Sequence, residues 1–396
     1  MNNNISYDNL YILKDYSNTI SKFSFDGFRF KNEKEVIEYY TKDTKELEKL
    51  NELKKNKELY ENFIECITGK KTLPLMYDSV FKKIFDFETH PERLASLLTS
   101  ILGYNVKIIG IFKNEGNISP KGPGVIFDIV VKMEDNSVAD VEAQKIPYDF
   151  TGKRMSVYSS ALTYHMYKHL RSIYGTELEY DKMNKVYTIV IFEKTTKEFK
   201  KPSLNNRFVF HGKTVFDDDL ELDMTQEFYL IALDVFRDHE YSIDIESIKI
   251  NEMSEEEFKK CCTYELSIWL QLLLVDNEEE MRSLSEKYPW IAEILVELIE
   301  FMQNPEEALN MYSNIYAELA ETDRVSIEHY NEKLRAMIEE KDSVIEEKDS
   351  VIEEKDSLIA QDKLVIEQQD KKIIEIMDYL STINISLPNY IIGIDE

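Results

Sequence analysis

Apolar and polar residues alternate most clearly between residues 125 and 145. Val125 to Met133 is rich in β-branched side chains, a Glu-Asp-Asn-Ser cluster follows, and the alternation resumes at residues 138–145. This pattern predicts a β-hairpin with its turn near Asp135. In that register Asp128 lies opposite Glu142. Period two then predicts an apolar face of Val125, Phe127, Ile129, Val131, Ala139, Val141 and Ala143, and a polar face of Asp128, Asp140, Glu142 and Gln144.

Two carboxylates on adjacent strands repel each other unless a positive group lies between them. A divalent cation such as Mg²⁺, or Mn²⁺ or Ca²⁺, accepts hard oxygen ligands of this kind. When bound, it lowers the pKa of a water molecule and stabilises charge on a phosphoryl oxygen. The other interpretation is that these residues are ordinary polar side chains on a solvated sheet face. The hairpin alone leaves both interpretations open.

Further motifs surround the hairpin in a fixed order: D-S-V-F-K-K-I-F at 78–85, F-D-I-V-V at 127–131, V-E-A-Q at 141–144, R-M-S-V-Y at 154–158 and V-Y-T-I-V-I-F at 186–192. From about Leu73 to Phe199, this order resembles the PD-(D/E)XK nuclease family transposases, also called recombination-promoting nucleases. The resemblance implies an α/β fold with a restriction-endonuclease-like core, in which helices flank a mixed sheet. It also implies a DNA endonuclease that depends on a divalent metal.

The resemblance further assigns roles to single residues. It implies a catalytic group of Asp78, Asp128, Glu142 and Gln144, in which the three acidic residues hold the metal. Gln144 stands where the superfamily's motif has lysine, so Lys82 from the first helix is a candidate for reaching into the site. The expected DNA contacts are Lys82, Arg154 and Tyr158.

Some of these residues also have simpler interpretations. Asp78 precedes a helical run of apolar residues, so it is a candidate N-cap as well as a ligand. Gln144 is also interpretable as an ordinary strand residue. Arg154 and Tyr158 lie one helical turn apart, and that helix face either binds phosphate or packs on the sheet.

Charge is unevenly spread along the chain. The formal net charge is -28, which disfavours non-specific binding to DNA. Residues 71–210, however, hold 20 Lys and Arg against 16 Asp and Glu, whereas every other part of the chain is net negative. The stretch that resembles the nuclease is therefore also the one that suits a polyanion, and residues 151–210 are its most basic part.

The order of predicted elements indicates five segments. They are an N-terminal charged accessory segment at 1–70, a nuclease-like domain at 71–245, an acidic helical region at 246–335, a coiled coil at 336–380 and a tail at 381–396. We expect one charged helical stretch at 32–68 that is mostly solvated, helices at 152–174, 254–275 and 289–335, and edge strands within 208–233.

Three copies of EEKDS followed by Val-Ile or Leu-Ile occupy residues 339–359. Apolar residues therefore recur every seven positions, which favours a coiled coil and a parallel homodimer. A lysine precedes each apolar pair by three or four residues, where a strong zipper would place a second leucine. A solvated single helix is the alternative interpretation.

Three cysteines without a C-x-x-C pair indicate a reducing compartment, and no apolar stretch is long enough to span a membrane. These features predict a soluble, cytoplasmic protein without a membrane partner. Two functions remain in view. One is a metal-dependent DNA endonuclease, and the other is a non-cleaving, DNA-associated or coiled-coil scaffold derived from such a nuclease.

Overall fold

The computed structural model describes residues 9–14, 16, 26–111, 128–145, 152–217, 220–237 and 253–383, without the side chains of 318, 321–340, 342 and 344. The chain divides into two compact units, Met1–Glu318 and Leu319–Glu396. The first unit contains the sheet and all the predicted site residues. Within the described part of the chain, no helix is long and apolar enough to cross a membrane.

The described strands form one mixed sheet in the order β1-β2-β3-β4-β6-β5. Their bounds are Ile108–Ile111 (β1), Ile129–Met133 (β2), Val138–Gln144 (β3), Val186–Phe192 (β4), Val209–Lys213 (β5) and Gln226–Ala232 (β6). β3, β4 and β6 are parallel, and the other pairings are antiparallel. Every residue of β4 is buried, as expected of a central parallel strand that is covered on both faces. The mixed sheet with flanking helices confirms the predicted α/β class.

The hairpin of β2 and β3 has the predicted register. Ile129 pairs with Val141 and Val131 with Ala139, so the turn centres on Asp135. Asn136 adopts a positive φ of 67° in that turn, which asparagine tolerates well. The residues expected to extend the first strand, 125–127, lie outside the described residues.

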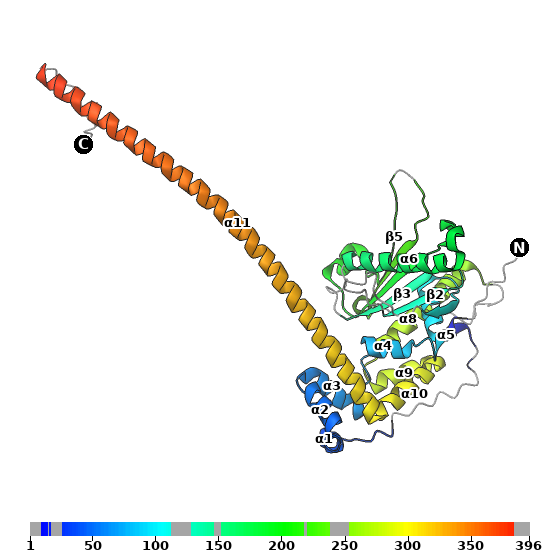
Figure 1. The fold of residues 1–396 in the computed structure, drawn as a ribbon. Coiled ribbons are helices and arrows are strands. Elements are labelled where there is room, and N and C mark those ends of the chain that lie inside the picture. Colours follow the sequence, from blue (N-terminus) through cyan, green and yellow to red (C-terminus); the bar gives the residue numbers. More distant parts are fainter. Residues whose placement is uncertain are drawn as a thin grey trace. The chain divides into compact units, whose positions relative to one another are not determined.

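The polar face of this hairpin is not solvated, contrary to one sequence interpretation. Helix α6 (Gly152–Tyr174), predicted with these bounds, lies across it (Figure 1). Leu162 and Met166 of α6 join a core cluster with Val130 and Val138 of the hairpin. α6 covers this face because its apolar side packs on the sheet. The acidic residues at even positions of the same face are therefore buried as well.

On the other side of the sheet lie α4 (Asp78–Ile84), α5 (Pro91–Leu102) and α8 (Glu255–Leu273), as Figure 1 shows. Proline at the start of α5 and Gly103 in the left-handed region beyond its end delimit that helix. α8 begins with a capping box formed by Ser254 and Glu257. Just after α5, the Tyr104 hydroxyl donates to the Tyr187 hydroxyl on β4.

One edge prediction was wrong. β6 lies inside the sheet, between β4 and β5, and only β5 occupies the edge. β6 pairs with β4 along seven residues, from Val186 opposite Gln226 to Phe192 opposite Ala232. The sequence between 208 and 233 alternates like an edge hairpin, but one arm of that hairpin continues the parallel core of the sheet.

Residues 32–68 form three helices instead of one solvated stretch. They are α1 (Glu33–Tyr40), α2 (Thr44–Leu53) and α3 (Lys57–Ile67), and each begins at an Asn or Asp whose side chain accepts a backbone N–H. Tyr40 and Phe63 are almost fully buried. The caps at Asp43 and Asn56 explain the breaks, because they stop one helix and start the next.

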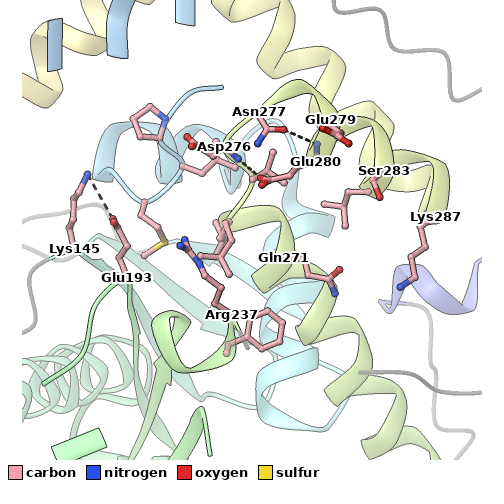
Figure 2. Close-up of a pocket in the computed structure, with 18 residues that line it drawn as sticks. Lys145, Glu193, Arg237, Gln271, Asp276, Asn277, Glu279, Glu280, Ser283 and Lys287 are labelled. Carbon is pink, nitrogen blue, oxygen red and sulfur yellow. Dashed lines mark hydrogen bonds and ion pairs between the residues drawn. The ribbon is translucent and has the colours of Figure 1, made fainter. Parts of the chain in front are cut away.

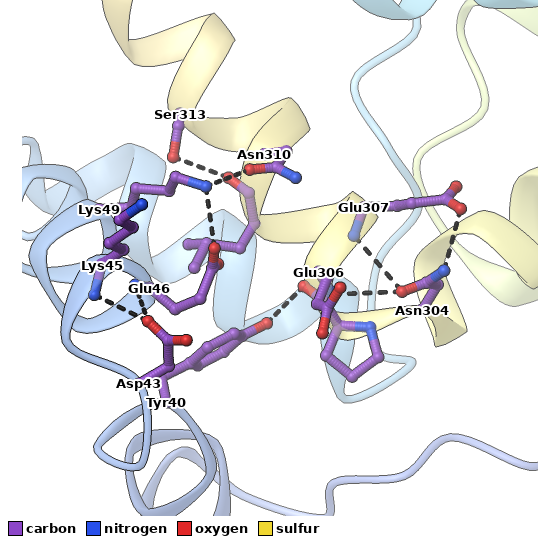
Figure 3. A network of polar contacts seen from close by, with 12 residues as sticks. Tyr40, Asp43, Lys45, Glu46, Lys49, Asn304, Glu306, Glu307, Asn310 and Ser313 are labelled. Atoms are coloured by element: carbon purple, nitrogen blue, oxygen red, sulfur yellow. Dashed lines mark hydrogen bonds and ion pairs between the residues drawn. The ribbon is translucent and has the colours of Figure 1, made fainter.

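These helices pack against the first turns of the last helix, α11 (Pro305–Thr382), in the network of Figure 3. The Tyr40 hydroxyl donates to the Pro305 carbonyl at 2.5 Å, and Lys49 Nζ donates to Asn310 Oδ1 at 2.6 Å. Residues far apart in sequence therefore share one core within the first unit.

The acidic helical region contains more breaks than the sequence predicted. α9 (Glu278–Lys287) lies between the two expected helices, and the expected helix at 289–335 is divided into α10 (Pro289–Gln303) and the start of α11. The break falls at Asn304, because proline disfavours helical geometry in the residue before it. Residues 336–380 are helical as predicted, but their pairing as a coiled coil stays a prediction.

A buried acid joins α8 to the N-terminal residues. The backbone N–H of Ile12 donates to Glu265 Oε2 at 3.0 Å, and the Ser96 hydroxyl donates to Oε1 of the same carboxyl. Ser96 in turn accepts from Trp269 Nε1 at 2.9 Å. Burial raises the pKa of Glu265 to about 7, and these hydrogen bonds offset the shift only in part. The fold therefore contains an acid that resists ionisation.

We expect Glu265→Gln to change how stability depends on pH. Because the folded-state pKa is raised, wild type loses stability from this group as pH rises through about 4.5 to 7. The neutral amide escapes that loss, so between pH 5.5 and pH 8.0 the variant should gain roughly 2 kcal/mol relative to wild type. Urea unfolding at both pH values measures it. Glu256→Gln on the same helix is the control, and an equal response of the two variants would contradict the assignment.

Candidate functional site

Asp128 and Glu142 are held together by reciprocal hydrogen bonds. The backbone N–H of Asp128 donates to Glu142 Oε1 at 3.0 Å, and the backbone N–H of Ala143 donates to Asp128 Oδ2 at 3.0 Å. Asp128 directly precedes β2, and Glu142 belongs to β3. The two residues lie side by side, as the hairpin register predicted, and each carboxylate is anchored by a backbone N–H of the segment that carries the other.

Lys82 brings a positive charge to these carboxylates from α4. Its Nζ lies 2.6 Å from Asp78 Oδ1 and 3.5 Å from Asp128 Oδ1. Asp78 and Lys82 are four residues apart, so they share one face of the helix. The N-cap of α4 is Tyr77, so the interpretation of Asp78 as an N-cap was wrong. Asp78, Lys82 and Asp128 are brought together as the sequence suggested.

The carboxyl groups of Asp128 and Glu142 carry raised pKa values. Burial raises the pKa of Asp128 to about 8, with further increases from the charges of Glu142 and Asp78 and a decrease from Lys82. Burial also raises the pKa of Glu142 to about 7, opposed by the Asp128 backbone N–H and by Arg154. One ammonium group therefore does not compensate the buried acids around it, and the site disfavours their full ionisation near neutral pH.

Asp140 is a third acid on the polar face of this hairpin, and the sequence pattern gave it no role. Burial raises its pKa well above the ordinary range, and in the described part of the chain neither carboxyl oxygen has a hydrogen-bond donor. When it is protonated, Asp140 can itself donate to Glu142, two residues along the same strand. That spacing was the available signal, because alternate residues of a strand share a face.

The other predicted site residues differ in how far they are buried: these are Gln144, Arg154 and Tyr158. Gln144 is the last residue of β3, half-buried on the same face as Glu142. Arg154 is exposed, and its Nη2 donates to the Tyr158 hydroxyl at 2.8 Å. Tyr158 is buried in the core cluster beneath α6. Tyr158 therefore packs on the sheet, whereas Arg154 is exposed, and phosphate binding by this helix face stays a prediction.

The chemistry of this group suits a hard cation. Its donors are buried carboxylate oxygens whose negative charge is not balanced by nearby cations. Carboxylate oxygens are the donor type that Mg²⁺ and Mn²⁺ accept. Among the described residues, no three His, Cys, Asp or Glu side chains are arranged to hold a metal ion. The ammonium of Lys82 lies between Asp78 and Asp128, and it would have to move if an ion bound both of them.

A cavity of about 1220 Å³ lies at the carboxyl ends of β3 and β4, where Lys145 and Glu193 line it (Figure 2). Its wall carries charges of both signs, including Glu193, Arg237 and Lys287. Lys145 Nζ lies 3.8 Å from Glu193 and 3.5 Å from the centre of the Tyr77 ring. Lys145 therefore belongs to the wall of the cavity, where its ammonium pairs with Glu193.

Comparison with known proteins identifies the family of this chain. Residues 75–330 match the model of the PD-(D/E)XK nuclease family transposases, which covers more than half of the chain. The chain belongs to that family. The match includes Asp78, Asp128, Glu142 and the whole sheet. Searches of curated proteins and of solved structures found no match.

We expect Lys82→Met to destabilise the metal-free protein at pH 8. The change removes the cation between Asp78 and Asp128, and a partly exposed charged contact of this kind is worth roughly 1–2 kcal/mol. Urea unfolding in the presence of EDTA measures the loss. Lys34→Met is the control, because it removes the highly exposed pair with Glu38 and should leave the midpoint unchanged. Equal midpoints for the two variants would show that Lys82 does not compensate the acids.

Proposed function

We propose that this chain is a DNA endonuclease that depends on a divalent metal, Mg²⁺ or Mn²⁺, and hydrolyses phosphodiester bonds. The observation that carries the proposal is the buried, reciprocally anchored pair of Asp128 and Glu142. Membership of a nuclease family supports it independently. Burying undercompensated carboxylates destabilises a fold, so a site of this kind is better explained by a bound cation than by structure alone.

In this proposal Asp128 and Glu142 hold the ion, and Asp78 completes the acidic group. When bound, such an ion would lower the pKa of a water molecule and stabilise charge on the scissile phosphate. Gln144 positions the attacking water through its amide. Arg154, exposed beside Glu142, is suited to hold a neighbouring phosphate.

Lys82 is suited to supply the positive charge that Gln144, at the position of the motif's lysine, lacks. Its ammonium already lies within 3.5 Å of Asp128, whereas Gln144 carries no charge. At that position the ammonium is suited to stabilise charge on a phosphoryl oxygen. The sequence departure at Gln144 is then compensated from α4.

A second function, a scaffold built on the C-terminal helix, is favoured by one specific observation. Five isoleucines at seven-residue intervals, Ile345, Ile352, Ile359, Ile366 and Ile373, are each about half exposed in the single chain. A second copy of the helix would cover this stripe, so we propose a parallel homodimer through residues 336–380. Dimerisation is compatible with either function. We also propose a reducing compartment, in keeping with the free, buried thiols of Cys66, Cys261 and Cys262.

Asp128→Asn should nearly abolish nicking of supercoiled plasmid DNA in Mg²⁺. The substitution removes a charge that holds the ion, yet it also relieves carboxylate repulsion, so the metal-free fold should be equally or more stable. Glu134→Gln on the exposed turn of the same hairpin is the control and should cut like wild type. Binding of DNA in EDTA should survive in both variants. Undiminished nicking by Asp128→Asn, or none by wild type in Mg²⁺ or Mn²⁺, would refute the nuclease proposal.

Deletion of residues 336–380 should convert a dimer into a monomer. The core of the first unit ends at Glu318, so the deletion removes the apolar stripe without touching that core. Light scattering gives the mass of each protein, and circular dichroism checks that the shortened chain is folded. A mass that corresponds to a monomer for both proteins would favour the solvated single helix.

A further inference from the structure

The outward face of α6 differs from the rest of this acidic protein. Residues 152–176 contain no Asp or Glu, although the whole chain has a net charge of -28. Acidic residues return only at Glu177, just after the helix. Over the same stretch, α6 carries Lys153, Arg154, Lys168 and Arg171. An acid-free stretch of this length in a strongly acidic chain indicates a surface with a specific role.

Six of the exposed residues of α6 lie along one side of the helix. Lys153, Val157, Ser160, Tyr164, Lys168 and Arg171 are all exposed. Their spacings of three, four and seven correspond to one side of a helix with 3.6 residues per turn. The opposite side packs on the sheet through residues such as Leu162 and Met166. We call the exposed line of six residues the α6 stripe.

The cations of the α6 stripe lack the acidic partners that several lysines on other helices have. On other helices, Lys34 pairs with Glu38, Lys57 with Glu61 and Lys259 with Glu255. None of Lys153, Lys168 and Arg171 forms an ion pair with any described residue. Lys168 Nζ lies 5.8 Å from the centre of the Tyr164 ring, whose side chain is about half exposed. These charges therefore remain available to a ligand.

The α6 stripe also begins beside the carboxylate group. Arg154, one residue beyond Lys153, donates to the Tyr158 hydroxyl, and its positive charge lowers the pKa of Glu142. From there the 23 residues of α6 extend for roughly 34 Å, which corresponds to about ten base pairs of a duplex. A nucleic-acid strand that enters the site could thus continue along unpaired cations.

We propose that the α6 stripe binds the phosphate backbone of duplex DNA and guides it toward the carboxylates of Asp128 and Glu142. The inference rests on the proposed nuclease function, and it names the surface by which the substrate is held. Lys153, Lys168 and Arg171 contact phosphates, and Tyr164 packs against the sugar-phosphate backbone between them. Contacts of this kind carry no sequence information, so the binding is independent of sequence.

The test compares two triple variants of the full-length protein in EDTA, so that no cleavage occurs. One variant, K153Q/K168Q/R171Q, removes the stripe cations. The matched control, K34Q/K45Q/K57Q, removes three exposed lysines of α1–α3 and changes the net charge equally. Fluorescence anisotropy with a labelled 20-base-pair duplex, at several salt concentrations, gives the affinity and its salt dependence.

At low salt we expect the stripe variant to bind at least tenfold more weakly than wild type, and the control to bind within about twofold of it. The slope of log affinity against log salt should fall by roughly 0.9 for each phosphate that is no longer neutralised, about 2.7 in all. If both variants bind equally weakly, net charge alone explains the loss and the proposal is overturned. Unchanged binding by the stripe variant would also overturn it. Unchanged binding would leave a protein partner as the occupant of the α6 stripe.

The outcome is separable from that of the nuclease proposal. Wild type that binds DNA through the α6 stripe but nicks no plasmid in either Mg²⁺ or Mn²⁺ would refute the nuclease proposal and keep the stripe. Wild type that nicks plasmid, with a stripe variant that binds duplex equally well, would keep the nuclease and refute the stripe. Circular dichroism of both triple variants excludes loss of fold as a cause.

Discussion

The close approach of acidic side chains on two adjacent strands is the constraint around which this fold is arranged. Asp128 and Glu142 each accept a backbone N–H from the opposing strand, so the hairpin register itself holds the two carboxylates together. α6 then covers them, and burial raises the pKa of both groups. A sheet optimised only for stability would place apolar side chains here. The cost of this arrangement is the main physical argument that the site has a function.

Other parts of the first unit support that arrangement without taking part in it. β4 is buried on both faces and fixes β3 from the side, and Lys82 supplies the nearest positive charge from α4. The helices that precede the nuclease-like core pack on the start of α11, so the two ends of the unit share one core.

The sequence predicted the local features of the fold well because they follow from short patterns. Alternation fixed the register around Asp135, and the apolar period of α6 gave its bounds. The breaks at Asp43, Asn56 and Asn304 were missed, although capping residues and a proline mark them, because the charged helical period continues across each one. β6 was misplaced because pairing with β4 depends on residues some 40 positions away. The burial of Asp140 was not predictable, because only the covering helix determines it.

The central claim is that the buried carboxylates of Asp128 and Glu142 hold a divalent cation. Titration calorimetry of Mn²⁺ into the full-length protein at constant ionic strength, with Asp128→Asn and Glu142→Gln in parallel, tests it most directly. We predict one saturable site per chain in wild type that is lost or strongly weakened in both variants, above the diffuse binding expected of an acidic protein. Indistinguishable isotherms for the three proteins would contradict the claim, because Mn²⁺ binding would then owe nothing to this pair.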